Sequence, residues 1–173
     1  MTAAPAIIGG ETYKVHSDLP DDADGKMICG ARITDPESAE ANKFAESYYR
    51  EIRHYSTDAQ KVSNNVGISY EEAMRIKNYL FVDNSKYDDI QKKWVPFDED
   101  CAIAHSWQRL MLGKDIKPHD RTLILHEIYE MEIKRENAGI SHEKAHEIAS
   151  KKYNYRKEAA KYYASLEKHK KRR

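Results

Sequence analysis

"HDRTLILHEIYE", residues 119–130, is the stretch that most constrains the fold of this chain. Pro118 precedes it and suits the first turn of a helix, whereas Gly139 follows it and suits a helix end. On a helix that turns about 100° per residue, the apolar residues of this segment lie almost all round the axis, which is typical of a buried helix. We therefore predict a central helix from Pro118 to about Asn137. Its apolar residues are Leu123, Ile124, Leu125, Ile128, Tyr129, Met131 and Ile133.

The rest of the chain indicates further amphipathic helices, separated by residues that start or stop a helix. Ser69 and Glu72 form a capping box, and Gly67 and Gly113 follow segments whose helices they can end. The other helices are predicted to begin at Pro36 after a cap at Thr34 or Asp35, at Thr57 or Asp58, at Ser69, at about Asp98 (ending at Leu112), after Ser141, and after Tyr155.

These elements predict an all-α fold, a single compact helical domain of about six to seven helices. We expect residues 1–33 to be an irregular N-terminal segment, with room for one short extended piece at 26–33. Residues 34–168 form the helical domain and residues 169–173 a basic tail. We predict a loop over 84–96, with Trp94 and its neighbour Val95 docking back on the domain, and no strand pair.

Composition excludes several classes of protein. The chain has 173 residues, with 29 Lys and Arg against 29 Asp and Glu, so it lacks the basic field of a dedicated nucleic-acid binder. No apolar run approaches the length of a membrane span, and the N-terminus lacks the basic region of a signal peptide. Cys29 and Cys101 are too few for a disulfide scaffold and lack zinc-finger spacing, so we interpret them as free thiols.

The segment "QKVSNNVGISYEEAMRIKN", residues 60–78, has the apolar and turn residues of a helix-turn-helix. Its second helix would present Tyr70, Glu71 and Glu72 to DNA. Two carboxylates in a groove would face a dense row of phosphates, so we interpret the segment as a structural helical hairpin.

Polar residues on the central helix are the main functional candidates. His119, His126 and Glu130 fall on one stripe of that helix, and buried ionisable groups need partners, solvent or a metal. The short link to the next helix makes the two helices antiparallel neighbours, so His146 can approach His126 and Glu130. The preceding helix adds a second polar line made of Asp98, Cys101, His105 and Arg109.

Four interpretations of this His/Glu cluster stay open. The first is a zinc or manganese site with His126, Glu130 and His146 as ligands, His119 or Asp120 as a further ligand, and Glu127 as base. The second is metal-free acid–base cleavage of a phosphodiester or glycosidic bond, with Arg53 or Arg109 stabilising charge. The third is a set of hydrogen bonds that joins helices. The fourth is a functional site elsewhere.

Six short motifs, taken in order, resemble a family of domains. The chain is similar, over about residues 30–168, to a C-terminal toxin-like domain of phage minor head (head-morphogenesis) proteins and bacterial polymorphic toxins. The chain departs from the resemblance at Asn78, where a His is expected. The motifs are "YYREIR", "TDAQKV", "IKNYLF", "FDEDCAIAHSWQRL", "HDRTLILHEIYE" and "AHEIASKKYNY".

The resemblance implies an effector module that a phage or secretion system delivers, acting in the bacterial cytoplasm. Many such domains are nucleases, so we expect a nuclease with a nucleic-acid substrate, and an immunity or virion protein as partner. A non-enzymatic phage module that binds a host or virion protein is the alternative. The expected catalytic set is His126, Glu127, Glu130, His119, Asp120, Arg53, His105 and Arg109.

Overall fold

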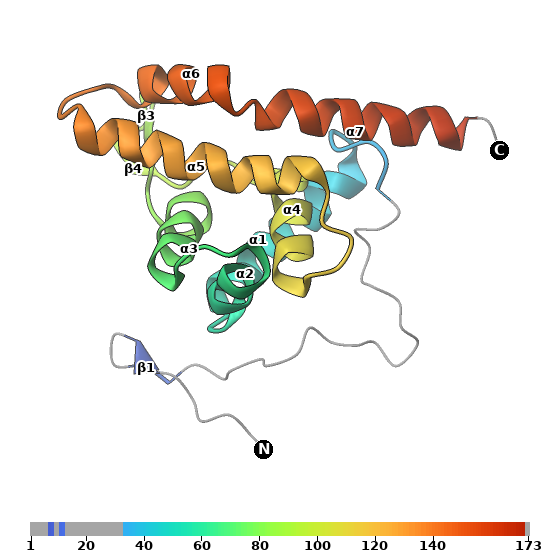
Figure 1. The fold of residues 1–173 in the computed structure, drawn as a ribbon, viewed down its shortest axis with the longest axis horizontal. Coiled ribbons are helices and arrows are strands. Elements are labelled where there is room, and N and C mark those ends of the chain that lie inside the picture. Colours follow the sequence, from blue (N-terminus) through green and yellow to red (C-terminus); the bar gives the residue numbers. More distant parts are fainter. Residues whose placement is uncertain (1–6, 9–10, 13–32, 172–173) are drawn as a thin grey trace.

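Helix α5 (Pro118–Glu136) lies between two groups of helices in the computed structural model, which describes residues 7–8, 11–12 and 33–171 (Figure 1). It contacts α3 and α4 on one side and α6 and α7 on the other. The predicted start at Pro118 and the central position are confirmed. The prediction of burial all round the helix is wrong at Leu125, which is 45% exposed, because neither layer covers that part of the helix surface.

The first layer contains the main hydrophobic core. Its centre is Trp107, fully buried and in edge contact with Phe81, which in turn contacts Tyr49. Large aromatic side chains remove much apolar surface from water and so dominate the stability of a small core. The helices of this layer are α1 (Ala39–His54), α2 (Asp58–Val66), α3 (Tyr70–Lys77) and α4 (Cys101–Leu112).

A buried ion pair joins three helices of this layer. Asp58 accepts hydrogen bonds from Lys77 Nζ at 2.7 Å and from Trp107 Nε1 at 2.9 Å. Both charges are almost completely buried, so each needs the other to offset its lost hydration. The segment that resembles a helix-turn-helix therefore forms the α2–α3 hairpin, with Gly67 left-handed at φ 78° between the helices.

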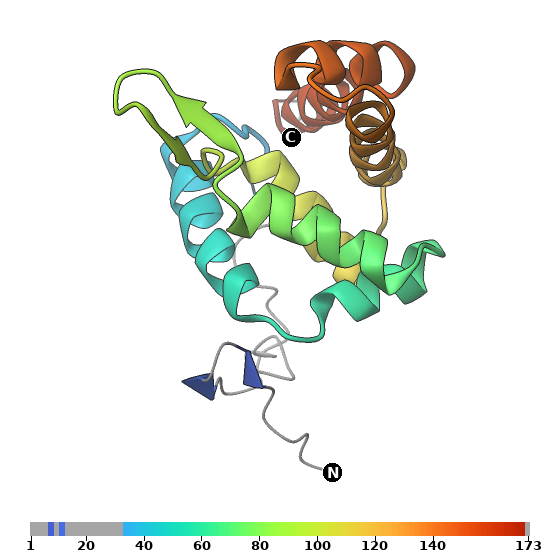
Figure 2. The ribbon, with the colours of Figure 1, turned by 90° about the vertical axis from the view of Figure 1, so that its left-hand side faces the viewer.

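The second layer is thin. Helices α6 (His142–Lys152) and α7 (Tyr155–Lys170) follow one another along α5, on the side opposite the first layer (Figures 1 and 2). Helix α6 buries only Ala145 and Ala149, which pack with Ile133 in a small separate cluster. Polar contacts between α5 and α6 therefore matter more here than in the main core.

Two predicted helix starts are wrong by about three residues. Helix α1 begins at Ala39 because Ser38, not Thr34 or Asp35, accepts the capping bond from Ala41 N. Helix α4 begins at Cys101 because Asp100 accepts the corresponding bond from Ile103 N. In both cases a second polar residue nearer the apolar segment forms the cap.

The segment after α3 also differs from the prediction. Helix α3 continues into a π-helix, η2 (Asn78–Val82), and the predicted loop contains a hairpin of β3 (Lys86–Asp88) and β4 (Lys93–Val95). Trp94 pairs with Tyr87 across the hairpin and stays 58% exposed, so it does not dock on the domain. Figure 2 shows the hairpin extending away from α6 and α7. Two further strands, β1 (Ile7–Ile8) and β2 (Glu11–Thr12), pair in the segment predicted to be irregular.

The predicted fold class is confirmed, because the described residues form one helical domain with seven α-helices and only two-stranded hairpins. The extended piece expected at 26–33 and the free thiol of Cys29 lie outside the described residues, apart from Ile33. Helix α7 runs to Lys170, into the segment predicted as a basic tail. Within the described residues, no helix has both the length and the apolar character to cross a membrane.

Candidate functional site

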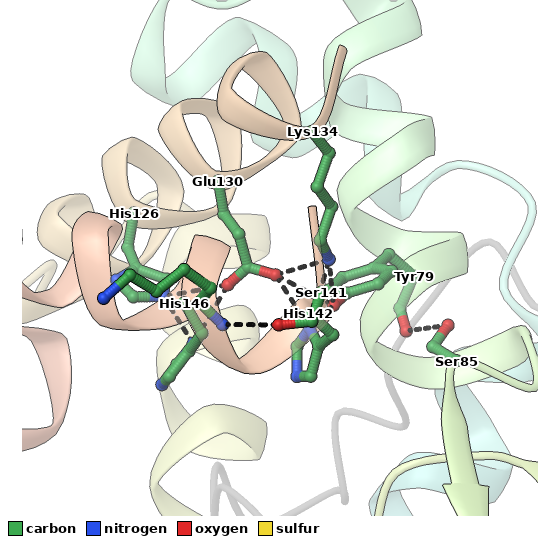
Figure 3. A network of polar contacts seen from close by, with 9 residues as sticks. Tyr79, Ser85, His126, Glu130, Lys134, Ser141, His142 and His146 are labelled. Carbon is green, nitrogen blue, oxygen red and sulfur yellow. Dashed lines mark hydrogen bonds and ion pairs between the residues drawn. The ribbon is translucent and has the colours of Figure 1, made fainter. Parts of the chain in front are cut away.

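The carboxylate of Glu130 is the centre of a polar network between α5, α6 and η2 (Figure 3). Its Oε1 lies 2.6 Å from Lys134 Nζ, 3.0 Å from Tyr79 Oη and 3.1 Å from His142 Nδ1. Its Oε2 faces the two histidines described next. The Glu130 side chain is only 2% exposed, so these contacts replace nearly all of its hydration.

Three potential ligand atoms converge beside this carboxylate. Glu130 Oε2 lies 2.9 Å from His146 Nδ1 and 3.4 Å from His126 Nε2, and the two ring nitrogens are 3.1 Å apart. His126 Nδ1 donates to the carbonyl oxygen of Tyr153 at 2.8 Å, so Nε2 donates to Glu130 when the ring is protonated and presents a lone pair when the ring is neutral. The His146 Nδ1 proton is then shared between a carboxylate oxygen and a ring nitrogen.

The helical spacing on α5 and the short connection from α5 to α6 explain why these atoms converge. His126 and Glu130 are one turn apart on α5, so their side chains share a face. The short connection from α5 to α6 returns the chain antiparallel, and His146 lies one turn after His142 on the facing side of α6. His126 and Glu130 are buried, whereas the His146 side chain is 50% exposed. The triad of His126, Glu130 and His146 is therefore open on its α6 side.

The network sets the charge of the carboxylate. Burial alone would raise the pKa of Glu130, but hydrogen bonds from His126, His142, His146 and Lys134 hold it well below its usual range. Burial lowers the pKa of His126, but the hydrogen bonds to Glu130 and to the Tyr153 carbonyl, together with the charges of Glu127 and Glu130, outweigh it and leave the pKa raised. Burial, followed by the Glu130 charge, raises the pKa of Tyr79 well above its usual range. Glu130 is therefore ionised and Tyr79 is a neutral donor at neutral pH.

Glu127 is buried without a partner next to this triad. Only 6% of it is exposed, and its Oε2 has no hydrogen-bond partner. Burial, with a contribution from the Glu130 charge, raises the pKa of Glu127 to about 7. A buried carboxylate oxygen without a donor is costly and is often found at functional sites.

A pocket of about 250 Å³ lies beside the triad, between α5, α6, α7 and the start of α4. His126, His146 and Glu127 line it, whereas Glu130 is not part of its lining. Its charged and polar lining otherwise consists of Glu37, Asn42, Glu99, Asp100, Ser150 and Arg156, and its apolar lining includes Ile103, Leu123 and Ala159.

Three of the predicted residues form a second, separate cluster. Arg109 donates to both oxygens of Asp120, from Nε at 2.7 Å and from Nη2 at 2.6 Å, and its Nη2 lies 3.1 Å from His119 Nε2. Asp120 also accepts from Lys117 N at the start of α5. The expectation that His119 shares a site with His126 is wrong, because seven residues along a helix separate them by about 10 Å.

The two remaining predicted residues lie in neither cluster. His105 is buried beside Cys101 and Tyr163, and its Nδ1 lies 2.7 Å from the Tyr163 hydroxyl. Arg53 donates from Nε to the carbonyl oxygen of Phe81 at 2.6 Å, which ties α1 to η2. Both contacts join helices of the fold.

The sequence-based selection missed three residues of the network. Lys134 is one turn after Glu130 and His142 is one turn before His146, so helical spacing is a signal that could have found both. Tyr79 comes from η2, and no local pattern indicates its approach to α5. Asn78, the position where a His was expected, immediately precedes Tyr79 as the first residue of this π-helix.

Comparisons with protein-family models, with curated proteins and with solved structures find no match to this chain. The chemistry of the triad and its pocket must therefore carry any assignment of function.

Proposed function

We propose that the protein is a divalent-metal-dependent hydrolase in which His126 Nε2, His146 Nδ1 and Glu130 Oε2 hold the ion. The observation that carries this proposal is the spacing of these atoms, 2.9, 3.1 and 3.4 Å. Ligands that bind zinc tetrahedrally at about 2.0–2.1 Å lie about 3.3 Å from one another. Within the described residues, this triad is the only group of three such side chains whose ligand atoms converge.

The surrounding contacts suit ligands of a metal. A ligating histidine usually donates its other ring N–H to a carbonyl or carboxylate, as His126 does to Tyr153. Tyr79, Lys134 and His142 hold the other oxygen of Glu130, which directs Oε2 toward the histidines. The His146 Nδ1 proton occupies the position that a cation would take, so metal binding should displace it to Nε2 of the same ring.

The ligand set and the pocket favour a hydrolytic site. Two histidines and one carboxylate suit zinc, with manganese as the alternative, and leave at least one coordination position for water. A zinc ion in such a site supplies a water with a pKa lowered to about 7. Glu127 lines the same pocket and its buried Oε2 has no hydrogen-bond partner, so we assign this carboxylate as the base that accepts a proton from that water.

Calorimetric titration with zinc and with manganese tests the metal site. We expect one ion per chain and a loss of affinity of at least about 100-fold in His126→Ala, Glu130→Ala and His146→Ala. His54→Ala is a matched control, because His54 is exposed on α1 and its hydrogen bond within the described residues is to the Arg50 carbonyl oxygen of the same helix. Full-affinity binding by His146→Ala, or no binding by the folded wild type, would overturn the triad.

Hydrolysis is tested with chromogenic phosphodiester, carboxylic-ester and peptide-anilide substrates. Activity should disappear in chelator and return with zinc, and Glu127→Gln should lower kcat at unchanged zinc affinity. Cleavage that persists in chelator would contradict the role of the metal and support the metal-free acid–base alternative.

A delivered nuclease effector is the second candidate. It is supported by the sequence resemblance and by the position of His126 and Glu130 in one site. Expression inside bacteria should then arrest growth, whereas His126→Ala and Glu130→Ala should not. Equal growth of all three strains would remove the effector function, and capture of a host or virion protein by all three would favour a non-enzymatic binding module.

A further inference from the structure

We infer that the pocket beside the triad accepts a positively charged group of the substrate, such as the side chain of Arg or Lys in a peptide. This inference rests on the proposed function, because it takes the pocket to be the substrate site of the metal centre. It goes further by assigning a substrate chemistry that differs from the nucleic acid implied by the resemblance.

The charges of the pocket lining carry the inference. Four carboxylates line it, Glu37, Glu99, Asp100 and Glu127, against Arg156 and, when the metal is bound, the two positive charges of the ion. Asp100 is engaged in capping α4, whereas Glu37 and Glu99 are exposed on their segments. A cleft lined mostly by one sign of charge attracts the opposite sign and raises its local concentration.

Glu127 is the independent sign that this pocket has a ligand. Only 6% of Glu127 is exposed, although the residue lines the pocket. Its Oε2 has no hydrogen-bond donor within the described residues. A substrate N–H group would supply a hydrogen bond to one oxygen of this carboxylate and leave the other to act as base, and charge-assisted hydrogen bonds of this kind are the stronger ones. A phosphodiester would instead bring a further negative charge next to Glu37 and Glu99.

The size and the walls of the pocket suit a side chain with an apolar stem. About 250 Å³ is less than the roughly 300–1,000 Å³ of pockets for whole small molecules. Ile103, Leu123 and Ala159 supply apolar wall between the carboxylates. Lys and Arg side chains bury their methylene stems along such surfaces while their charged ends reach polar groups.

Two probes of the same shape, one charged and one neutral, test whether the pocket prefers a positively charged group. We would titrate the isotope-labelled protein, with and without zinc, with N-acetyl-arginine amide, with the neutral N-acetyl-citrulline amide, and with an octathymidylate. The arginine probe should shift backbone resonances of the pocket residues and bind at least about 10-fold more tightly than the citrulline probe. The oligonucleotide should leave those resonances unchanged.

Substitutions locate the site of binding. Glu37→Gln combined with Glu99→Gln should weaken the arginine probe about 10-fold and leave zinc affinity unchanged. Glu71→Gln is the matched control, because Glu71 is an exposed carboxylate on α3 outside the pocket. Equal binding of the two amides, or pocket shifts caused by the oligonucleotide, would overturn the inference even when zinc binds. If the protein binds the arginine probe more tightly than the citrulline probe but does not bind zinc, the metal proposal is overturned and the pocket remains a site for a cationic group.

Discussion

Glu127 and Glu130 are both buried carboxylates on α5, yet they have opposite surroundings. Glu130 has five polar groups around it, whereas one oxygen of Glu127 has none. A polar group without a partner lowers stability, and natural proteins keep such a group mainly where function needs it. Glu127 therefore lowers the stability of the fold. Glu130 instead stabilises it, by joining α5 to α6 and η2.

Replacing each of these carboxylates by Met should separate the two roles. We expect Glu127→Met to raise the free energy of unfolding by about 1–2 kcal/mol, because it removes an unsatisfied group. Glu130→Met should lower it by about 3 kcal/mol, because Lys134 and three other partners lose their acceptor. Urea unfolding in chelator measures both without a contribution from metal. A lower stability of Glu127→Met would show that Glu127 stabilises the fold.

His105 should make the protein sensitive to acid. Burial, helped by the charge of Arg109, lowers the pKa of His105 to about 4 in the folded protein, against about 6.5 when unfolded. The unfolded chain therefore binds a proton at this residue between these values while the folded protein does not, so stability falls as pH drops from about 6.5 to 4. The loss reaches about 3 kcal/mol for this pKa difference.

The measurement is urea unfolding at pH 7, 6, 5 and 4 for the wild type and His105→Gln. The variant should lose less stability than the wild type over this range. Parallel curves would contradict the assignment, whatever the other titrating groups contribute to both proteins.

At the scale of elements, η2 is the feature that brings a third part of the chain to the site. The π-helix follows α3 directly, and its second residue, Tyr79, reaches Glu130, His142 and Lys134. Inserted π-helical turns are frequent at functional sites because they redirect the side chains that follow. Here the consequence is a neutral hydroxyl that holds the carboxylate of a proposed ligand.

Tyr79→Phe should therefore weaken zinc binding without unfolding the protein. Loss of a partner behind a metal ligand typically costs 10–100-fold in affinity, and we expect about 10-fold because Lys134 and His142 remain. Calorimetric titration measures the affinity, and Tyr70→Phe, an exposed tyrosine on α3, is the control. Unchanged affinity would place Tyr79 outside the metal site.

The same elements show how far local patterns predict this molecule. The Ser69–Glu72 box and the left-handed glycines, Gly67 and Gly113, are local features, so the helix ends that they set were predicted correctly. The pairing of His126 with Glu130 follows from helical spacing, and His146 from a short connection. The π-helix was not predicted because it depends on packing against α1, which is distant in sequence. The β3–β4 hairpin was not predicted although its pairing is local, because the segment was interpreted as a loop that docks on the domain.

At the scale of the whole molecule, the triad connects α5, which belongs to the main core, to α6, which does not. The main core includes residues of α1 to α4, η2, α5 and α7, but none of α6. Helix α6 packs on α5 through the small cluster of Ala145, Ala149 and Ile133, with the partly buried Tyr129, Ile140 and Ile148 against it, and through His146 and His142. Elements with few buried apolar contacts open locally at low free energy. A bound ion would join two ligands on α5 to one on α6. Because α6 is the more weakly packed of the two helices, the ion should stabilise α6 most.

Hydrogen exchange should show this effect directly. At a zinc concentration of about 100 times Kd, binding stabilises the competent state by about 2.7 kcal/mol, so the amides of α6 should exchange up to about 100-fold more slowly. Chelator should reverse the protection. His146→Ala retains both α5 ligands but removes the connection to α6, so zinc should leave its α6 amides unprotected. Identical exchange of α6 in the wild type with zinc and with chelator would mean that no ion bridges the layers, and that hydrogen bonds alone hold α6 against α5.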